Sequence, residues 1–298
     1  MYKIVICGLG AVGMTYACKF KHKNVCLKIL ADHSRIESFK VNKPCLNGTP
    51  QEFDYITQED CFIADLIIIS TKAQGLESAI SYIKNCIGEN SRIISLINGI
   101  SSEEKIKKAY PSAKVLKSYF IGHSAVREGN NTTQDGIGTI VLEKDEITEK
   151  ILKDLNIDYF VPDDIDYSMW LKYTFNLFSN QVSAILDMTF GEMRQNKYFI
   201  DFAKNVIKEV KQIADKKGIK NLDNLEKDAI NSLSKMCDEG KTSMLQDILA
   251  KRPTEVDMFA GEIIRMGKLY GIQTPYNQIL YDLIKIKESN NEHSIHSC

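Results

Sequence analysis

The spacing of apolar residues divides the chain into a first part that alternates strands with helices and a second part that is helical. A short run rich in β-branched residues, 2–7, ends at the glycine turn 8–13, and a second apolar run covers 25–30. Near-continuous apolar runs at 65–70 and 91–97 repeat this pattern. Such runs are typical of strands buried on both faces of a parallel sheet. The alternation predicts a doubly wound, Rossmann-type α/β domain.

The stretches between and after these strands complete the first part. Helical spacing of apolar residues predicts three helices, over 34–41, 72–87 and 102–110. Residues 45–62 are polar and predict irregular structure. A further strand is predicted over 114–120, and the alternating, glycine-containing segment 121–145 favours antiparallel strands added to the edge of the parallel sheet.

Beyond Pro162 the pattern becomes helical, with no convincing strand from Ile165 to Lys285. Five helices are predicted, over 167–186, 199–217, 224–237, from Thr254 to about Tyr270, and from Pro275 onward. Thr254, with Asp257 three residues later, predicts an acidic capping box, and Gly271 predicts the end of that helix. We therefore expect a dinucleotide-binding domain at 1–163 and an all-α substrate-binding domain at 164–298.

The glycine turn carries the strongest chemical signal in the chain. Strand, glycine turn, helix, strand and then Asp32, nineteen residues after Gly13, is the order of a dinucleotide-binding fingerprint. Gly8 permits the tight turn, Gly10 a close approach of the pyrophosphate, and Gly13 close packing of helix on strand. The fingerprint predicts that the cofactor lies against Gly8, Leu9, Gly10, Ala11, Val12 and Gly13.

Composition narrows the class of protein. The chain has 298 residues, a formal net charge of −1 and scattered lysines, which gives no sign of a nucleic-acid surface. No apolar run is long enough to cross a membrane, and the N-terminus reads as a core strand, so we expect a cytoplasmic protein without a membrane partner. The eight cysteines show no CxxC pair and the five histidines no ligand spacing, which indicates thiols without a disulfide framework or a metal site.

Polar residues that could carry chemistry fall into three groups. Ser70, Thr71 and Lys72 follow one predicted strand and Asn98 follows the next, at the sheet edge where ligands bind. Lys172, Asn176 and Asn180, spaced i, i+4 and i+8, share one face of a mostly apolar helix, where they need partners unless that face is solvated. Ser243 and Glu255 belong to the third group, although a carboxylate in the first turn of a helix is also favoured by the dipole alone.

Taken together these residues resemble the ketopantoate reductase family (2-dehydropantoate 2-reductases) over nearly the whole chain. The matching segments are Gly8-Leu9-Gly10-Ala11-Val12-Gly13, Thr71-Lys72-Ala73, Leu96-Ile97-Asn98-Gly99, Trp170 with Lys172 and Asn176, Ser243-Met244 with Asp247, and Arg252-Pro253-Thr254-Glu255 with Gly261. The resemblance implies a Rossmann domain joined to a helical domain, with a small 2-oxo acid bound in the cleft between them.

The resemblance also implies a role for each matching residue. Lys172 would protonate the keto oxygen as hydride arrives from the nicotinamide, and Glu255 would bind the developing hydroxyl and orient the lysine. Asn98 would lie beside the nicotinamide and Lys172. Asn176, Asn180 and Ser243 would bind the substrate's hydroxyl and carboxylate.

One position departs from the family pattern and bears on the cofactor. Where the family usually has an arginine that meets the 2′-phosphate of NADPH, this chain has Asp32, which would accept hydrogen bonds from the ribose hydroxyls of NADH. Arg35 and Lys72 would offset its charge, so the cofactor is NADPH or NADH with a lean towards NADH.

The function expected is reduction of ketopantoate to pantoate in coenzyme A biosynthesis. Three alternatives stay open: another small 2-oxo acid as substrate, an opine- or 6-phosphogluconate-type dehydrogenase, and a non-catalytic sensor of nicotinamide cofactor. The first two share the two-domain plan, and the last would require Lys172 or Glu255 to be absent or misplaced. A homodimer is left open.

Overall fold

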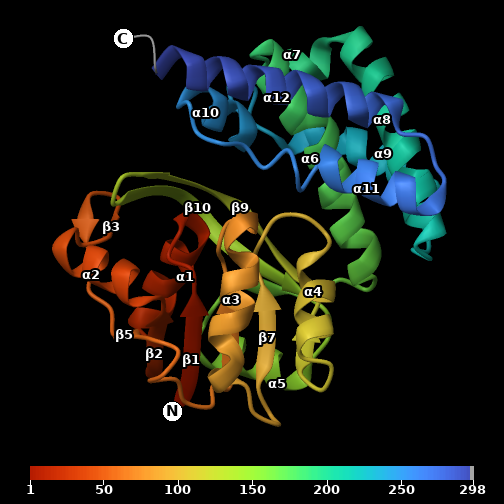
Figure 1. Cartoon of the computed structure of the whole chain (residues 1–298). Helices are drawn as coiled ribbons and strands as arrows, with labels where there is room; N and C mark the ends of the chain where they lie inside the picture. Colours follow the sequence, from red (N-terminus) through yellow and green to blue (C-terminus); the bar gives the residue numbers. More distant parts are fainter. Residues whose placement is uncertain (296–298) are drawn as a thin grey trace. The chain divides into compact units, whose positions relative to one another are not determined.

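The structure is a computed structural model that describes residues 1–295, with side chains throughout that range except at 123, 124 and 291–295. The chain forms two compact units, Met1–Ile165 and Asp166–Cys298, and each is described by itself (Figure 1). The first unit contains the described strands and the second is helical, as the apolar pattern predicts. None of the described helices is both long and apolar enough to cross a membrane.

A six-stranded parallel sheet forms the centre of the first unit. Its order is β5-β2-β1-β6-β7-β8, and the strands are β1 (Tyr2–Cys7), β2 (Val25–Leu30), β5 (Tyr55–Ile56), β6 (Leu66–Ile69), β7 (Arg92–Ser95) and β8 (Lys114–Leu116). Every adjacent pair is parallel. Helices α1 (Ala11–Lys21), α3 (Leu76–Tyr82) and α4 (Ser102–Ala109) connect successive strands. The Rossmann-type sheet predicted from the apolar runs is confirmed.

The antiparallel strands, in contrast, do not extend this sheet. The long hairpin β9 (Ser118–Glu128) and β10 (Asn131–Leu142) belongs to a second sheet with β3 (Cys45–Leu46), β4 (Thr49–Pro50) and β11 (Tyr159–Phe160). Next to β7, the hydroxyl of Ser118 donates to the carbonyl of Ser95 and accepts from its N–H, both at 3.0 Å. The prediction that these antiparallel strands are added to the edge of the parallel sheet was wrong, because at β7 the side chain of Ser118, and not the backbone of β9, forms the hydrogen bonds.

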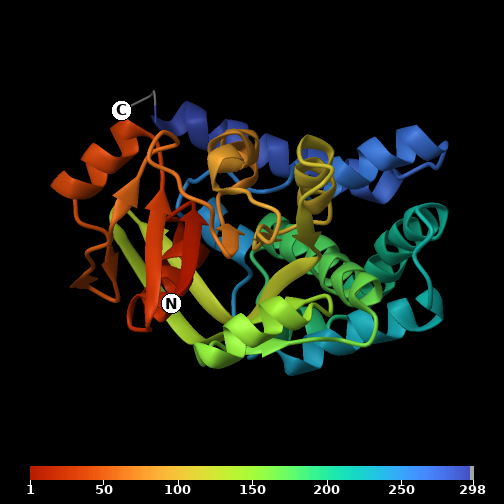
Figure 2. The same cartoon turned by 90° about the horizontal axis from the view of Figure 1, so that it is seen from below.

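Two further corrections concern local elements of the first unit. Residues 45–62, expected to be irregular, contain β3, β4 and β5, each of two residues. The partners of β3 and β5 are β10 and β2, which lie far away in the sequence, whereas β4 pairs with β3. Helix α5 (Glu146–Asp154) was not predicted. Its Ile151 and Leu152 are buried in one core with Ile140 of β10, and Figure 2 shows α5, in light green, alongside the hairpin. Helix α2 (His33–Val41) lies where predicted.

The expectation that the cysteines are thiols without a disulfide is also corrected, at one pair. Cys61 and Cys86 form a disulfide, with their Cα atoms 5.3 Å apart. The N–H of Ala64 donates to the carbonyl of Cys86 at 3.0 Å, so the segment before β6 lies against the end of the helical stretch 73–86. This tertiary contact brings together two residues that are 25 positions apart in the sequence. Five other cysteines, Cys7, Cys18, Cys26, Cys45 and Cys237, are free thiols, and Cys298 lies outside the described residues.

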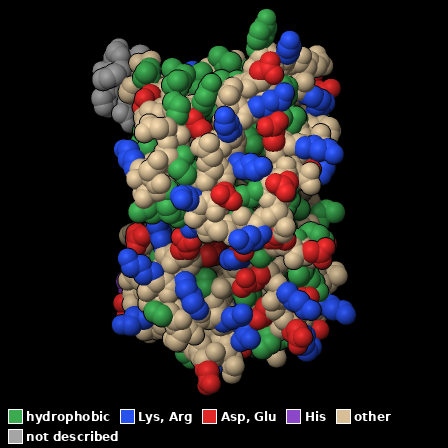
Figure 3. Space-filling view, turned by 90° about the vertical axis from the view of Figure 1, so that its right-hand side faces the viewer, with side chains coloured by type: hydrophobic (Ala, Val, Ile, Leu, Met, Phe, Trp, Pro, Cys, Tyr) green, Lys and Arg blue, Asp and Glu red, His purple; other side chains and the backbone are tan. Residues whose placement is uncertain are grey.

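The second unit consists of helices. They are α6 (Ile165–Leu186), α7 (Phe190–Gln195), α8 (Lys197–Lys216), α9 (Leu225–Asn231), α10 (Ser243–Leu249), α11 (Ala260–Tyr270) and α12 (Pro275–Ile295). Short helices α7 and α10 were not predicted, since six or seven residues are too few to show a period. Gly271 ends α11 in the left-handed conformation, with φ of 68°, and Pro275 opens α12, both as predicted. Figure 3 shows Lys and Arg interspersed with Asp and Glu on the face it presents.

The capping box predicted at Thr254 is wrong. Helix α11 begins at Ala260, and the residues from Thr254 to Phe259 form a separate turn. The Thr254 hydroxyl accepts only from the N–H of Val256, at 3.3 Å, while its own N–H donates to Glu288 of α12 at 2.7 Å. A tertiary contact therefore overrides the local capping signal.

The start of α12 is capped from another helix. The carboxylate of Glu209, on α8 and 6% exposed, accepts from the N–H of Tyr276 at 2.8 Å and from the N–H and side-chain amide of Asn277 at 3.1 and 2.7 Å. These bonds satisfy N–H groups that the first turn of a helix leaves without partners. Glu209 thereby fixes the register between α8 and α12.

We expect Glu209→Ala to lower the free energy of unfolding by about 3 kcal/mol, because three buried donors lose a charged acceptor. The measurement is urea denaturation followed by circular dichroism. Exposed Glu226 on α9 is the matched control, and its alanine variant should change stability by less than about 0.5 kcal/mol. Equal effects of the two substitutions would contradict the capping role.

Candidate functional site

The glycine turn is packed against the end of the neighbouring strand. A Cβ atom on Gly8, whose φ is 103°, would lie 2.6 Å from the backbone nitrogen of Thr71, and one on Gly13 would lie 1.9 Å from the carbonyl oxygen of Gly8. The Ser70 hydroxyl donates to that same oxygen at 2.7 Å. The turn after β1 and the end of β6 are therefore one unit, as the sequence predicts for Gly8 and Gly13.

Gly10 differs because an added Cβ atom would fit there without a clash. A Cβ atom there would meet its nearest atom, the carbonyl oxygen of Ser70, at 3.7 Å. Helix α1 begins directly after Gly10 without a side-chain cap, so the N–H groups of its first turn, at Ala11 and Val12, have no intrahelical acceptor. N–H groups without an intrahelical acceptor, at the positive end of a helix and next to a residue without a side chain, suit a pyrophosphate. The residues present therefore fit a dinucleotide.

Asp32 has a structural task at the end of β2. Its carboxylate caps α2, accepting from the Ser34 hydroxyl at 2.7 Å and from the Arg35 N–H at 2.8 Å. These two hydrogen bonds lower the pKa of Asp32, so it carries its negative charge at neutral pH. The same carboxylate is exposed enough to meet a ribose, so the cap and the predicted cofactor contact are compatible.

The other predicted residues of this unit follow adjacent strands. Lys72 is exposed and precedes the short 3₁₀ turn Ala73–Gly75 after β6, and Asn98 is half-buried in the turn after β7. Because β1, β6 and β7 are neighbours and parallel, the glycine turn, Lys72 and Asn98 share one edge of the sheet. The predicted grouping at the carboxyl ends of the strands is what the fold produces.

One residue at this edge was missed. Arg127, on β9 of the second sheet, donates to the carbonyl of Leu9 in the glycine turn at 2.5 Å and to the carbonyl of Gly129 at 2.9 Å. Burial and the positive charge of Arg35 lower the pKa of Arg127. Arg127 therefore lies against the glycine turn and within electrostatic reach of Arg35, and no local pattern around Arg127 signals this.

In the helical unit, α6 carries the predicted polar face. Lys172 and Asn176 are half-buried and Asn180 is 5% exposed. Burial lowers the pKa of Lys172 to about 8, and the negative charge of Glu255 opposes that shift. The structure therefore brings Lys172 and Glu255 within electrostatic reach, although 83 positions separate them in the chain.

The position of Glu255 excludes a helix dipole as the reason for a carboxylate there. It lies in the turn before α11 and not in the first turn of a helix, so a helix dipole does not account for it. The hydroxyl of Tyr173, next to Lys172 on α6, lies 3.0 Å from the carbonyl oxygen of Met258 and 2.8 Å from that of Phe259 and donates to them. The helix that carries the lysine thus also holds the turn that carries the carboxylate.

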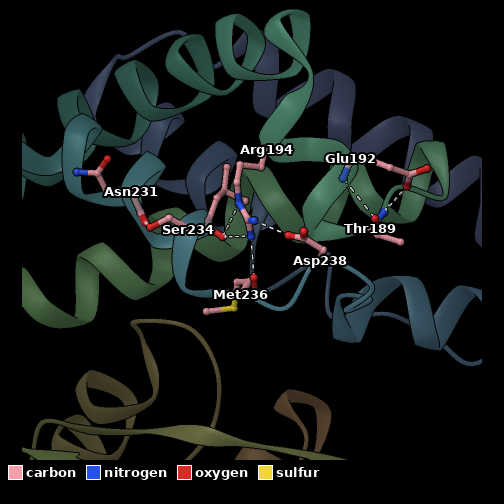
Figure 4. Close-up of polar contacts among 8 residues, drawn as sticks. Thr189, Glu192, Arg194, Asn231, Ser234, Met236 and Asp238 are labelled. Carbon is pink, nitrogen blue, oxygen red and sulfur yellow. Dashed lines mark hydrogen bonds and ion pairs between the residues drawn. The ribbon is translucent and has the colours of Figure 1, made fainter.

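Ser243 opens α10 and is exposed, and Thr242 caps this helix by accepting from the N–H of Leu245 at 3.2 Å. The chain before it is held by Arg194 of α7. Figure 4 shows this guanidinium pointing to Met236 and Asp238; it donates to the Met236 carbonyl at 2.7 Å and pairs with the Asp238 carboxylate. Arg194 therefore sets the path of the segment that leads to Ser243.

Comparison with known families agrees with this arrangement. The model of the ketopantoate reductase PanE/ApbA family matches residues 4–146, and the model of the PanE/ApbA C-terminal domain matches residues 164–288. The chain belongs to the ketopantoate reductase family. It is therefore a nicotinamide-dependent reductase.

Individual relatives span the full length of the chain. It is 27% identical to the 2-dehydropantoate 2-reductase of Aquifex aeolicus, with 97% of this chain and 98% of that protein covered. Among solved structures, D-mandelate dehydrogenase in complex with NADH has a TM-score of 0.84 at 24% identity, covering 97% and 99% of the two chains. A dimeric ketopantoate reductase from Staphylococcus aureus has a TM-score of 0.73 at 21% identity, with 97% and 99% covered. These structures share the fold.

The two glycines Gly10 and Gly13 should respond differently to the same added methyl group. Gly13→Ala forces a Cβ against the carbonyl of Gly8 and should lower the free energy of unfolding by about 3 kcal/mol. Gly10→Ala makes only an ordinary contact with the Ser70 carbonyl oxygen and should cost less than about 1 kcal/mol. It should nevertheless weaken NADH binding about tenfold or more, because the methyl group would occupy the approach to the helix N-terminus. Thermal unfolding and fluorescence titration with NADH measure the two effects. Undiminished NADH affinity in a folded Gly10→Ala protein would place the cofactor elsewhere.

Proposed function

We propose that this reductase converts ketopantoate (2-dehydropantoate) to pantoate, as in coenzyme A biosynthesis, with the proton supplied by Lys172. The observation that supports this most directly is a half-buried lysine, Lys172, whose pKa is lowered by burial and raised by the charge of Glu255 on the same unit. A lysine with a pKa of about 8 is mostly protonated at pH 7, yet gives up its proton more readily than an ordinary lysine. That combination suits a general acid.

Each residue of the helical unit then has a stated task. The Lys172 ammonium donates a hydrogen bond to the keto oxygen, polarises the carbonyl and transfers its proton as the alkoxide forms. Glu255 keeps the lysine charged and accepts from the new hydroxyl. Asn176, Asn180 and Ser243 bind the substrate's hydroxyl and carboxylate, and Asn98 of the first unit lies by the nicotinamide. When bound, the nicotinamide cofactor supplies the hydride.

We further propose NADH as the preferred cofactor. Asp32 is charged at neutral pH and lies at the end of β2, where it accepts hydrogen bonds from ribose hydroxyls and repels a 2′-phosphate. The opposing feature is the pair Arg35 and Arg127 beside the glycine turn. Arg127 donates two hydrogen bonds to backbone carbonyls, so we propose that it stabilises the glycine turn. Asp32 then has the larger effect on the choice of cofactor.

The nearest alternative is the same reaction on a different small 2-oxo acid. Steady-state assays of the purified chain with ketopantoate, 2-oxoisovalerate and phenylglyoxylate, each with NADH and NADPH, separate these readings. A kcat/KM for ketopantoate that exceeds the others by tenfold or more supports the proposal. A higher kcat/KM for another acid would show that this acid is the substrate. Sedimentation of the same preparation tests whether the protein is a homodimer.

Replacing the general acid should remove turnover without unfolding the protein. We expect Lys172→Ala to lower kcat by about a hundredfold or more, since a positioned acid contributes about that factor. In the unmodified enzyme, log kcat/KM for reduction should be flat below pH 8 and fall above it, because the lysine must be protonated to donate. Near-normal turnover of folded Lys172→Ala would exclude Lys172 as the acid.

Charge at position 32 should govern the choice of cofactor. At an effective dielectric constant of about 20, a carboxylate a few ångströms from a 2′-phosphate is repelled by about 4 kcal/mol before screening by salt and by arginines. We therefore expect the unmodified enzyme to favour NADH in kcat/KM and Asp32→Arg to shift the ratio towards NADPH. A tenfold preference of the unmodified enzyme for NADPH would show that the two arginines dominate.

A further inference from the structure

The turn that carries Glu255 is tied to the last helix of the chain. The N–H of Thr254, directly before Glu255, donates to Oε1 of Glu288 on α12 at 2.7 Å. The other carboxylate oxygen of Glu288 lies 3.2 Å from Nζ of Lys285, and the same ammonium lies 3.0 Å from Oδ2 of Asp257. A chain of charged groups from α12 therefore reaches both sides of Glu255.

These contacts differ in strength. Asp257 and Lys285 have side chains that are 64% and 38% exposed, and an ion pair at such a surface contributes little. The Glu288 side chain is only 17% exposed, and its bond to a backbone N–H is charge-assisted. Glu288 is thus the member of this set that fixes the start of the turn.

The end of the turn is fixed from the opposite side. Tyr173 of α6 donates to the carbonyls of Met258 and Phe259, and the rings of Tyr173 and Phe259 stack with centroids 6.0 Å apart. Because Tyr173 follows Lys172 directly, this end of the turn moves with the lysine. The start of the turn, where Glu255 lies, is instead held by α12, through the hydrogen bond from Thr254 to Glu288.

We propose that Glu288 is a positioning residue, which holds the start of the turn so that the Glu255 carboxylate faces the Lys172 ammonium. This inference rests on the proposed function, in which those two groups act on the substrate. It assigns to α12 a part in catalysis although Glu288 touches neither substrate nor cofactor. The relevant geometry is the single hydrogen bond from Thr254.

The electrostatics give the proposal a signature that a structural role would lack. Burial lowers the pKa of Lys172 and the charge of Glu255 raises it. If the start of the turn loosens, Glu255 moves away and the pKa of Lys172 falls further, so the alkaline limb of the pH profile moves to lower pH. The charged groups packed around the turn are Asp257 on the turn itself and Lys285 and Glu288 on α12, and Glu262 and Arg265 of α11 act on Tyr173.

The test compares three variants of the full-length enzyme. Glu288→Ala removes the acceptor for the Thr254 N–H, whereas Glu288→Gln keeps an acceptor oxygen and loses only the charge. Asp282→Ala is the matched control, because Asp282 lies on the same helix, is exposed and accepts from Gln278 of its own helix. Hydrogen exchange of the segment 254–259 by mass spectrometry, and the pH dependence of kcat and kcat/KM, are measured for each.

The expected result is specific to one variant. Glu288→Ala should speed exchange in 254–259 about tenfold, lower kcat about tenfold to a hundredfold and move the alkaline limb to lower pH, since small displacements of a catalytic group have effects of that size. Glu288→Gln and Asp282→Ala should stay within about threefold of the unmodified enzyme in kcat.

Other outcomes overturn the inference. Unchanged exchange in Glu288→Ala would show that Glu288 does not hold the turn. Faster exchange with unchanged kcat and pH profile would reduce Glu288 to a structural residue, and an equal loss in Glu288→Gln would mean that its charge acts directly. Failure of the proposed function is distinguishable, because it would appear in the unmodified enzyme, as a kcat/KM for ketopantoate that does not exceed those for the other 2-oxo acids, whatever the Glu288 variants do.

Discussion

Burying an ammonium group on α6 is the constraint on which the helical unit depends. Lys172 lies on a helix whose neighbouring positions are largely apolar, so its charge would be costly there without a negative partner. Glu255 supplies that charge, but it comes from a turn 83 positions further along the chain. The packing of α6, the turn and α12 brings these two groups within electrostatic reach of each other.

The α/β unit depends on a different constraint, the close packing of backbone atoms at two glycines that have no side chain. Gly8 and Gly13 lie so close to the ends of β1 and β6 that a single methyl group would collide with backbone atoms. This close packing presents the first turn of α1 to the solvent side of Gly10, where its N–H groups can bind phosphate. Tight packing at Gly8 and Gly13 and room for an added carbon atom at Gly10 are thus two results of one short glycine turn.

Several charged residues in this protein serve structure and site together. Asp32 caps α2, and in the proposed function its carboxylate also favours NADH over NADPH. Glu209 caps α12 from α8, and α12 in turn holds the turn that carries Glu255. Because each carboxylate accepts backbone N–H groups, it is oriented before any ligand binds, which lowers the cost of ordering the site.

The sequence by itself determined the features that depend on local pattern. Apolar runs and glycine spacing predicted the parallel sheet, the dinucleotide turn, the long helix α6 and the stop at Gly271, because strand burial, φ above zero and helical period are written in adjacent residues. The face shared by Lys172, Asn176 and Asn180 follows in the same way from a period of 3.6 residues.

Only the tertiary structure decided what depends on distant partners. The hairpin β9–β10 does not extend the parallel sheet, because the Ser118 side chain pairs with Ser95 of β7 and β10 pairs with β3 and β11 instead. Thr254 lost its expected capping role because Glu288 takes its N–H, and Arg127 reached the glycine turn from the second sheet. The electrostatic interaction of Lys172 with Glu255 belongs to this group, since burial of the lysine and the nearby carboxylate that offsets its cost both arise only when the helices are packed.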